Sequence, residues 1–544
     1  MPDMASLRKR TSTQILQALE TGVMQSQGGN LTAAQRSAVA GYLGIAPVVT
    51  PRTIATNRCA PQPDWSASQG WDSWGGGPEN RRFQANGGLP AADVPRLKLR
   101  WAFAVPNATA VRSQPAVSGG RVFFGGQDGN VYALDAKTGC THWEAKIPSQ
   151  VRSGIALVSL NGKTIVLVGD VTANVTAIDA ATGTRLWSRK VDDNLYAMIT
   201  STPLVIGDRI YLGVSSREES EGGKPGYICC TFRGSAVALN LADGTIVWKT
   251  WSTSEPPSPR GRNKQGAETL GPSGAGIWGT PTWDRKRGLL YFVTGDNYSD
   301  PTTETSDALL ALDPKDGRIL WSHQYTSGDA FNVTCFAADK VNCPDSNGPD
   351  HDFGSSAILT DAGTLLLAQK SGVLRAVDPD RRGYVLWEDH IGKGGPLGGI
   401  QWGPASDGKN IYVALSDVTV PGSAGGLFAL SLANGERLWQ TPNTFCGSKP
   451  QCRPAQSGAV TAIPGIVFSG SLDGHLRAYA ANSGKIVWDY DTAHEFPTVN
   501  GVKGIGGSLD SGGPVIAGGM VFAGSGYGAF GSTPGNVLLA FGPE

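Results

Sequence analysis

Six oxygen-bearing side chains stand in or beside loops that are longer than a hairpin needs. Long insertions occupy residues 215–235, 271–281 and 328–352, and loops of such length are usually functional. Carboxylate and amide oxygens are hard donors of the kind that Ca²⁺ binds, although a single carboxylate in a Gly-rich loop is more often a turn former. The set together favours a metal site, with the donors Glu218, Glu219, Asp296, Asn297, Asp350 and Asp352.

The elements that must position these loops are copies of one repeat. Each copy has an apolar strand, a turn with Asp or Asn and Gly, and a second strand that closes on Trp, which is typical of a β-hairpin. A period of roughly 40 to 70 residues indicates a propeller, because one blade alone cannot bury its faces. We interpret the repeated Trp residues as packing between blades: Trp143, Trp187, Trp248, Trp321, Trp387, Trp439 and Trp488.

The two ends of the repeat region supply an eighth blade. Residues 536–541 match the first strand of the repeat, and residues 97–103 match its Trp strand. Pairing them closes a ring and removes two exposed strand edges. The sequence therefore predicts an all-β, eight-bladed propeller over residues 97–544.

Charge and hydropathy exclude two classes of partner. Lys plus Arg equals Asp plus Glu, at 46 each, so no global charge recruits nucleic acid. No apolar run is long enough to predict a membrane span.

The eight cysteines predict disulfides and an oxidising compartment. Cys335 with Cys343, and Cys446 with Cys452, would close short loops, and no CxxC spacing favours a metal instead. We therefore expect a periplasmic or secreted protein, although no signal peptide is seen in the first residues of this chain.

The first 96 residues differ from the rest. Residues 1–45 are predicted to be helical, at 14–24 and 31–43, with Thr32 as an N-cap. Residues 46–96 are rich in Pro, Gly and Asn and are expected to wrap the propeller. No CxxCH motif is present, so we expect no covalent haem in this chain.

The repeat ALDxxTGxxxW, together with YICCTFRGS, GAGIW, TGDNYS, PDHDFGSS and AQKSG, resembles the quinoprotein alcohol dehydrogenases that depend on pyrroloquinoline quinone (PQQ). The resemblance implies oxidation of secondary alcohols to ketones, on polyvinyl alcohol or a similar polyol, with PQQ and Ca²⁺ or a lanthanide as cofactors and a cytochrome c as electron acceptor. Residues 1–45 resemble the C-terminal half of a cytochrome c domain, with Met24 at the axial-ligand position.

The same resemblance implies roles for individual residues. It places the metal ligand at Glu218, with Glu219 as the fallback, and a second ligand at Asp296 or Asn297. Asp350 is the implied catalytic base, with Asp329 as its competitor, and Asp352 the additional ligand of lanthanide-using relatives. The implied quinone contacts are Trp278, Lys370, Arg152, Thr200, Ser215, Gln401 and Trp402.

Two departures from the family's pattern accompany these assignments. The adjacent Cys229 and Cys230, implied to cover the quinone, come later in the chain than in methanol dehydrogenases, and Arg112 replaces a glutamate of those relatives. Two alternatives stay open: a non-catalytic propeller scaffold, and a PQQ dehydrogenase of another small secondary alcohol.

Overall fold

The structure is a computed structural model that describes residues 10–20, 28, 31–44, 57–62, 65–68, 70–222, 224, 226–443, 446 and 452–544. The chain divides into two compact units, Met1–Thr56 and Asn57–Glu544. Each unit is considered by itself.

The described residues of the first unit include the helices α2 (Ser12–Glu20) and α4 (Ala33–Leu43). The Thr32 hydroxyl accepts from the Gln35 amide at 3.2 Å, and the Gln35 side chain accepts from the Thr32 amide at 2.8 Å. Thr32 is thus the N-cap, as the sequence predicted, and the capping box satisfies two donors at the start of α4. The helices pack through Ile15, Leu19 and Ala40. Met24 lies outside the described residues.

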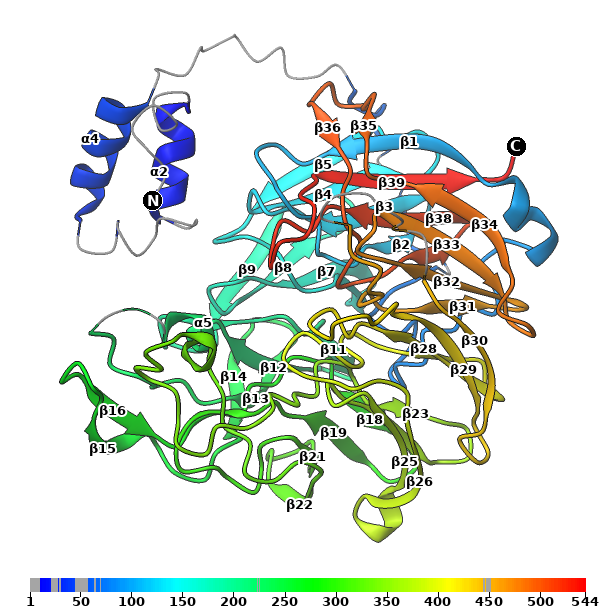
Figure 1. The fold of residues 1–544 in the computed structure, drawn as a ribbon. Helices are drawn as coiled ribbons and strands as arrows, with labels where there is room; N and C mark the ends of the chain where they lie inside the picture. Colours follow the sequence, from blue (N-terminus) through cyan, green and yellow to red (C-terminus); the bar gives the residue numbers. More distant parts are fainter. Residues whose placement is uncertain are drawn as a thin grey trace. The chain divides into compact units, whose positions relative to one another are not determined.

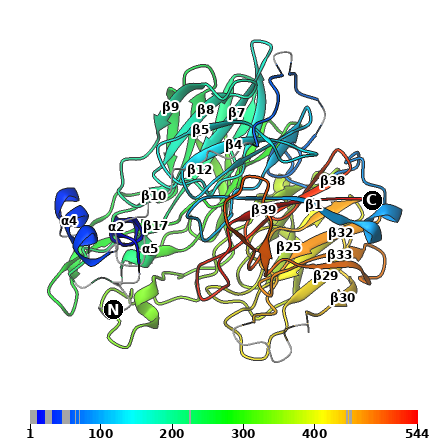
Figure 2. The same ribbon diagram turned by 90° about the horizontal axis from the view of Figure 1, so that it is seen from above.

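In the described part of the second unit, the strands form eight antiparallel blades, seven of them four-stranded sheets and one extended by a fifth strand (Figures 1 and 2). Blades 1 to 4 contain β2 (Ala116–Ser118), β3 (Arg121–Gly125), β4 (Asn130–Asp135) and β5 (Thr141–Lys146); β6 (Ala156–Leu160), β7 (Lys163–Gly169), β8 (Asn174–Asp179) and β9 (Arg185–Lys190); β11 (Leu204–Ile206), β12 (Arg209–Ser216), β13 (Ser235–Asn240) and β14 (Ile246–Trp251); and β18 (Thr282–Asp284), β19 (Leu289–Val293), β21 (Ala308–Leu312) and β22 (Ile319–Gln324).

Blades 5 to 8 contain β23 (Ile358–Leu359), β24 (Leu365–Ala368), β25 (Val373–Asp378) and β26 (Tyr384–His390); β27 (Ala405–Ser406), β28 (Asn410–Leu415), β29 (Gly426–Ser431) and β30 (Arg437–Thr441); β31 (Thr461–Ile463), β32 (Ile466–Gly470), β33 (His475–Ala480) and β34 (Ile486–Asp491); and β37 (Val515–Ala517), β38 (Met520–Ser525), β39 (Val537–Gly542) and β1 (Lys98–Ala104).

The connections carry the remaining elements: η1 (Ala91–Arg96), β10 (Ala197–Met198), which pairs with β12, α5 (Glu218–Glu221), η2 (Val333–Phe336) and η3 (Pro379–Arg381), with the two-stranded sheets β15 (Ser258–Arg262) with β16 (Glu268–Gly271), β17 (Ser273–Gly274) with β20 (Asn297–Ser299), and β35 (Glu495–Phe496) with β36 (Gly504–Ile505).

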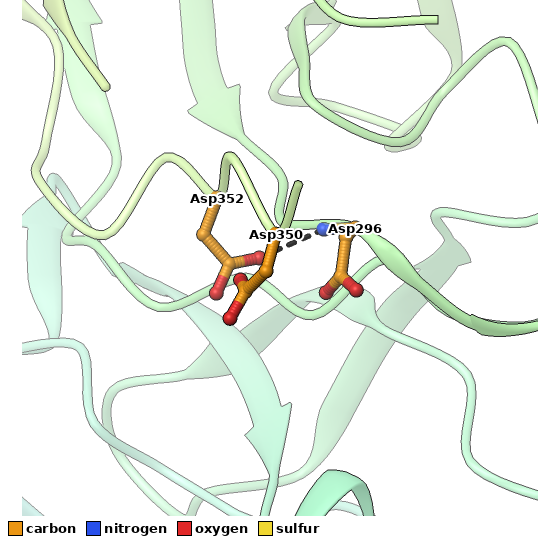
Figure 3. Close-up of side chains that lie close together, drawn as sticks. All are labelled: Asp296, Asp350 and Asp352. Carbon is orange, nitrogen blue, oxygen red and sulfur yellow. Dashed lines mark hydrogen bonds between the residues drawn. The ribbon is translucent and has the colours of Figure 1, made fainter. Parts of the chain in front are cut away.

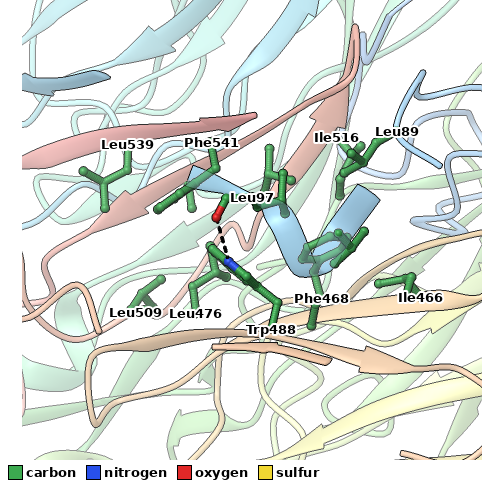
Figure 4. Close-up of a cluster of buried hydrophobic side chains, with 14 of the residues drawn as sticks. Leu89, Leu97, Ile466, Phe468, Leu476, Trp488, Leu509, Ile516, Leu539 and Phe541 are labelled. Carbon is green, nitrogen blue, oxygen red and sulfur yellow. Dashed lines mark hydrogen bonds between the residues drawn. The ribbon is translucent and has the colours of Figure 1, made fainter. Parts of the chain in front are cut away.

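Blade 8 joins the two ends of the propeller sequence, as predicted. β1 pairs antiparallel with β39, with Leu99 opposite Phe541 and Phe103 opposite Leu538, and Figure 1 shows the two strands side by side. The adjoining core is drawn in Figure 4, where the Trp488 indole donates to the Leu97 carbonyl at 3.1 Å. The closing strand is therefore held by backbone pairing and by a buried aromatic of blade 7.

The repeated Trp residues dock on the turn of the next blade. The Trp248 indole donates to the Pro314 carbonyl at 3.0 Å, and Gly317 in the same turn has φ +73°. A Cβ at Gly317 would lie 2.4 Å from the Trp248 ring, so both the backbone angle and the contact require glycine. The same contact recurs for Trp101–Gly139, Trp143–Gly183, Trp187–Gly244, Trp387–Gly435 and Trp439–Gly484.

Antiparallel pairing determines where the long loops gather. In a blade of four consecutive antiparallel strands, the segment that leads into the first strand and the loop between the second and third lie at the same end. Asp296, Lys370 and Glu219 follow second strands, whereas Trp278 and Asp350 precede first strands. Residues from different blades are therefore brought to one end of the ring.

The segment before the propeller also contacts the blades. Arg82 is fully buried and donates to the carbonyls of Val460 at 2.6 Å and Gly512 at 2.9 Å. The Asn80 side-chain amide donates to the Pro281 carbonyl at 3.1 Å. These bonds join the segments leading into blades 4, 7 and 8, a structural role for a stretch to which the sequence assigned no chemistry.

All eight cysteines are paired, which confirms the prediction of disulfides. The pairs are Cys59–Cys140, Cys229–Cys230, Cys335–Cys343 and Cys446–Cys452. Among the described helices, none has the length and apolarity needed to cross a membrane.

Candidate active site

Three aspartates from two loops meet at one buried point (Figure 3). Asp296 lies between β19 and β20, and Asp350 and Asp352 lie in the loop that leads to β23. One carboxylate oxygen of each lies within 4.8 Å of the other two. The structure thus brings together half of the six oxygen donors considered from the sequence.

The Asp296 carboxylate is buried and has no hydrogen-bond partner in the part of the chain that the structure describes. Neither of its oxygens accepts a hydrogen bond from the described residues. Burying an ionised carboxylate without compensation is unfavourable, and a hard cation coordinated by oxygen removes that penalty. This orphaned group shows that the residues present fit a metal ion.

Backbone contacts fix the positions of the other two aspartates. The Asp296 amide donates to Asp352 Oδ1 at 2.8 Å. The amides of Asp350 and His351 donate to the Asp329 carboxylate at 3.1 and 2.8 Å. Asp329, the competing candidate for the base, therefore holds this loop through its backbone.

Gly295 allows the two loops to approach each other. A Cβ at this position would lie 1.9 Å from Asp352 Oδ1, a separation that no real Cβ contact shows. The close approach of the two loops therefore requires glycine at position 295.

Lys370 places a fixed positive charge beside the aspartates. Its ammonium lies 2.8 Å from Asp350 Oδ1 and 2.8 Å from Asp352 Oδ2. Burial alone would lower the pKa of Lys370, but the two carboxylates outweigh burial and raise that pKa well above its ordinary value. The ammonium therefore stays charged.

The acidic groups hold protons more tightly than usual. Burial, reinforced by Asp352 and Asp350, raises the pKa of Asp296 well above its ordinary value. Burial also raises the pKa of Asp350 well above the ordinary range, even though Lys370 opposes the shift. For Glu219, burial raises the pKa to about 7. A bound cation would lower these raised pKa values, because it favours the ionised carboxylates.

An arginine lies between two indole rings at the same end of the propeller. The guanidinium carbon of Arg152 is 5.6 Å from the Trp278 ring and 5.2 Å from the Trp402 ring, a cation–π geometry. The Trp402 indole donates to Asp510 Oδ1 at 2.7 Å, and the Trp278 carbonyl accepts from the Thr200 hydroxyl at 2.9 Å. Trp402 is therefore held through its indole nitrogen, and Trp278 through its backbone carbonyl.

Two guanidinium groups are unpaired. The Arg112 guanidinium lies 4.7 Å from the centre of the Tyr527 ring, and neither it nor Arg152 forms a hydrogen bond or ion pair with the described residues. Burial, with repulsion from Arg112, lowers the pKa of Arg152 to about 10. Two neighbouring cations that form no ion pair with the described residues fit an anionic ligand.

A cavity of about 260 Å³ reaches Arg152, Lys370 and two of the three aspartates. Its polar lining includes Arg152, Glu219, Asp350, Asp352, Lys370 and Gln401. Aromatic and apolar side chains complete the wall, namely Met198, Trp278, Phe331, Val333, Phe336, Pro396, Leu397, Trp402, Tyr527 and Phe530.

Glu218 does not join the aspartates. Its carboxylate accepts from the Tyr227 hydroxyl at 2.6 Å, the Thr231 amide at 2.8 Å and the Phe232 amide at 2.7 Å. Successive residues of a helix point about 100° apart, and in α5 it is Glu219, the fallback, that lines the cavity. The sequence located the loop but not the residue of it that faces the site.

Asn297 also faces away from the aspartates. Its side-chain amide donates to the Ser273 carbonyl at 2.9 Å, and its oxygen accepts from the Thr303 amide at 2.8 Å. Of the two neighbours that the sequence left open, the structure therefore places Asp296 in the cluster.

Four of the residues implied to contact or cover the quinone, namely Cys229, Cys230, Ser215 and Thr200, do not line this cavity. Cys229 and Cys230 are buried in a core that includes Phe232 and Tyr298. The Ser215 hydroxyl, fully buried, lies 3.0 Å from the Thr200 hydroxyl. Thr200 itself lines a smaller, adjacent cavity together with Trp278, Arg112 and Arg152.

Asp307 was missed by sequence reasoning. It is fully buried, and both of its oxygens lack a partner among the described residues. Burial, followed by repulsion from Asp329, raises its pKa well above the ordinary value. Asp307 directly precedes the third strand of its blade and has a φ of +47°. In other blades the same position is held by a glycine with positive φ, as at Gly129, Gly372 and Gly474. A non-glycine residue at this repeated position was the available signal.

Comparison with known proteins agrees with the fold. The family described as the glucose/ethanol/alcohol dehydrogenase β-propeller domain matches residues 71–339, and that of the outer membrane protein assembly factor BamB matches residues 369–528. The chain is 38% identical to a polyvinylalcohol dehydrogenase of Pseudomonas sp, over 98% of this chain and 89% of the relative. It is 36% identical to the polyvinylalcohol dehydrogenase of Sphingopyxis sp. (strain 113P3), over 99% and 89%.

A solved structure shows the same fold. The quinohemoprotein alcohol dehydrogenase from Comamonas testosteroni superimposes with a TM-score of 0.62 at 19% identity, over 90% of this chain and 83% of that one.

The 38% and 36% identity to two relatives over nearly the whole chain defines an enzyme class, the quinoprotein alcohol dehydrogenases. The chain belongs to the PQQ-dependent alcohol dehydrogenase family and, within it, is polyvinyl alcohol dehydrogenase-like. The family implies PQQ and a metal ion as cofactors. The alternative of a non-catalytic scaffold is therefore wrong.

Proposed function

We propose that this enzyme oxidises secondary alcohol groups of polyvinyl alcohol, or of a similar polyol, to ketones and passes the electrons to a cytochrome c. The names of the two full-length relatives support the substrate. The likeness of residues 1–45 to part of a cytochrome c, ahead of a linker at 46–96 and the propeller at 97–544, supports the acceptor. Four disulfides support a periplasmic or secreted location.

The orphaned Asp296 carboxylate is the observation that carries the proposal. Asp296, Asp352 and Glu219 would hold Ca²⁺ through hard oxygens, with Asp350 close enough to contribute. The additional carboxylate of Asp352 makes a lanthanide the alternative ion. Trp278 would stack on the flat quinone, and the unpaired Arg152 and Arg112 would face its carboxylates.

The chain's own residues divide the chemistry among them. When bound, PQQ and its metal ion supply a two-electron acceptor and a Lewis acid. Asp350 accepts the hydroxyl proton of the alcohol, because Oδ2 of Asp350 has no partner among the described residues, whereas both oxygens of Asp352 are engaged. Cation binding at Asp296 favours the ionised form of Asp350 that a base requires. Lys370 stabilises negative charge that develops on the acceptor.

Reconstitution tests this function. Purified protein is supplied with PQQ, with Ca²⁺ or a light lanthanide, and with polyvinyl alcohol beside small secondary alcohols, and oxidation is followed with a dye acceptor. We expect activity that needs both PQQ and metal, and a loss of about 100-fold or more in Asp350→Asn. Asp352→Asn should instead weaken metal binding. Absence of turnover with every metal would contradict the proposal.

A further inference from the structure

The cavity has two chemically different regions. Asp350, Asp352 and Lys370 form its ionic region, where the alcohol is oxidised under the proposed function. Two phenylalanines, Phe336 and Phe530, line the same cavity but are 67% and 56% exposed. A hydrocarbon surface therefore runs from the reacting groups to solvent.

Leaving these rings in water is unfavourable. Burying a phenylalanine side chain contributes about 1.5–3 kcal/mol, and exposed apolar surface beside a pocket indicates a binding site. Both rings come from loops at the end of the propeller that carries the site, and they are almost 200 residues apart in the chain. Their meeting at one cavity is a property of the fold.

The loop of Phe336 is well anchored. Phe336 ends η2, whose first turn is capped by Asn332, and the adjoining residues are closed by the Cys335–Cys343 disulfide. The Phe331 ring packs edge-on against Phe336 with centroids 5.1 Å apart. The Asn342 side chain donates to the Gly222 carbonyl at 2.7 Å, which joins this loop to α5. Phe336 is thus held in its exposed position.

Phe530 is held in an unfavourable backbone conformation. Its φ is +49°, in the left-handed region where a bulky residue is rare. The surrounding turn is tight, with the Ala529 amide bonded to the Tyr527 carbonyl at 2.8 Å and the Ser532 amide to the Ala529 carbonyl at 2.9 Å. Strained residues of this kind concentrate at ligand clamps and active sites.

We infer that Phe336 and Phe530 form an apolar clamp that grips the hydrocarbon backbone of a polymeric alcohol on each side of the hydroxyl-bearing carbon being oxidised. The inference rests on the proposed function. A cavity of about 260 Å³ cannot enclose a polymer, so most of the chain must lie outside the cavity, where the two exposed rings can contact it. The clamp residues determine specificity for chain length and take no part in the proton transfer.

The test compares substrates of one chemistry and different length. Holoenzyme with Phe336→Ala, Phe530→Ala or both is offered polyvinyl alcohol and pentane-2,4-diol, which contains two repeat units. We expect KM for the polymer to rise about 10-fold for each ring removed, with kcat and the kinetics of the diol within about 2-fold. Tyr384→Ala, on the outer strand β26 and 51% exposed, is the matched control.

Two further readouts separate the clamp from catalysis and from folding. Equilibrium binding of fluorescently labelled polyvinyl alcohol should weaken in the double variant whether or not turnover occurs, and PQQ affinity should not change. Phe530→Gly should keep or raise Tm, because glycine relieves the left-handed strain, while still losing affinity for the polymer. Equal losses for polymer and diol, or unchanged polymer binding in the double variant, would overturn the clamp. Failure of wild-type turnover with intact clamp-dependent binding would instead contradict the proposed function.

Discussion

At the scale of single residues, the neighbours Glu218 and Glu219 have opposite surroundings. Glu219→Gln should weaken metal binding about 10- to 100-fold, because it removes a carboxylate from the cavity wall. Glu218→Gln should leave metal affinity nearly unchanged but lower the free energy of unfolding by about 1–3 kcal/mol, because its amide group would meet buried donors. Both variants are measured by metal titration and by thermal unfolding, and each serves as the control for the other. Loss of metal affinity in Glu218→Gln but not in Glu219→Gln would refute the assignment.

The unpaired arginines make a separate prediction. Arg112→Ala and Arg152→Ala should each weaken PQQ binding about 10-fold or more, because each removes a cation that forms no ion pair with the described residues. PQQ binding is measured by fluorescence titration of the metal-loaded protein. Arg100→Ala, at an exposed position, is the control. Wild-type affinity in Arg112→Ala would exclude that residue as a cofactor contact.

The raised pKa of Glu219 predicts a pH dependence with a definite sign. Between its ordinary value of 4.5 and about 7, the folded metal-free protein binds more protons at this position than the unfolded chain. The contribution of Glu219 to stability therefore falls as pH rises through that window, and Ca²⁺ affinity rises. The free energy of unfolding of wild type and of Glu219→Gln, compared without metal from pH 5 to 8, measures this contribution. A stability difference between the two that does not change with pH would contradict the prediction.

At the scale of elements, the approach of two loops depends on Gly295. Gly295→Ala should displace Asp352 and weaken metal binding by 10-fold or more, because a Cβ would lie 1.9 Å from the Asp352 oxygen. The control is Gly458→Ala, where the nearest atom to a Cβ is 3.6 Å away. Metal titration distinguishes the two, and equal affinities would show that the loop can yield.

The elements were more predictable from the sequence than the directions of their side chains. Trp and Gly recur at fixed places in the repeat because each Trp packs on the turn of the next blade, so the blades and their closure by β1 could be predicted. Whether Asp296 or Asn297, and Glu218 or Glu219, faces the site depends on the direction in which each of two neighbouring side chains points within a short element. No periodicity in the sequence determines these directions, so the sequence could narrow each metal ligand only to a pair of neighbouring residues.

Contacts made by loops were less predictable still. The pairing of Cys59 with Cys140 joins residues 81 apart in the chain, and the burial of Arg82 depends on carbonyls from distant blades. Phe336 and Phe530 are ordinary apolar residues in the sequence, and only the closed ring brings them to one cavity.

At the scale of the whole molecule, the ring is stabilised where its two ends meet. Trp488 is 8% exposed and contacts both Leu97 and Phe541 across that junction. Trp488→Ala should lower the free energy of unfolding by about 3–5 kcal/mol, since it leaves a cavity at the closing blade. Trp251→Ala, at 38% exposure, should have a much smaller effect. Denaturant unfolding compares them, and similar losses would contradict a special role for the closure.

The most direct test titrates alcohol oxidation against PQQ in the presence of excess metal, for wild type and for Asp296→Asn. The predicted result is activity that saturates at one PQQ per chain in the wild type, with no activity when the metal is omitted. Asp296→Asn, still folded by circular dichroism, should lose both metal binding and turnover. Oxidation by wild type without metal, or full activity in Asp296→Asn, would contradict a metal-dependent quinoprotein site at this cluster.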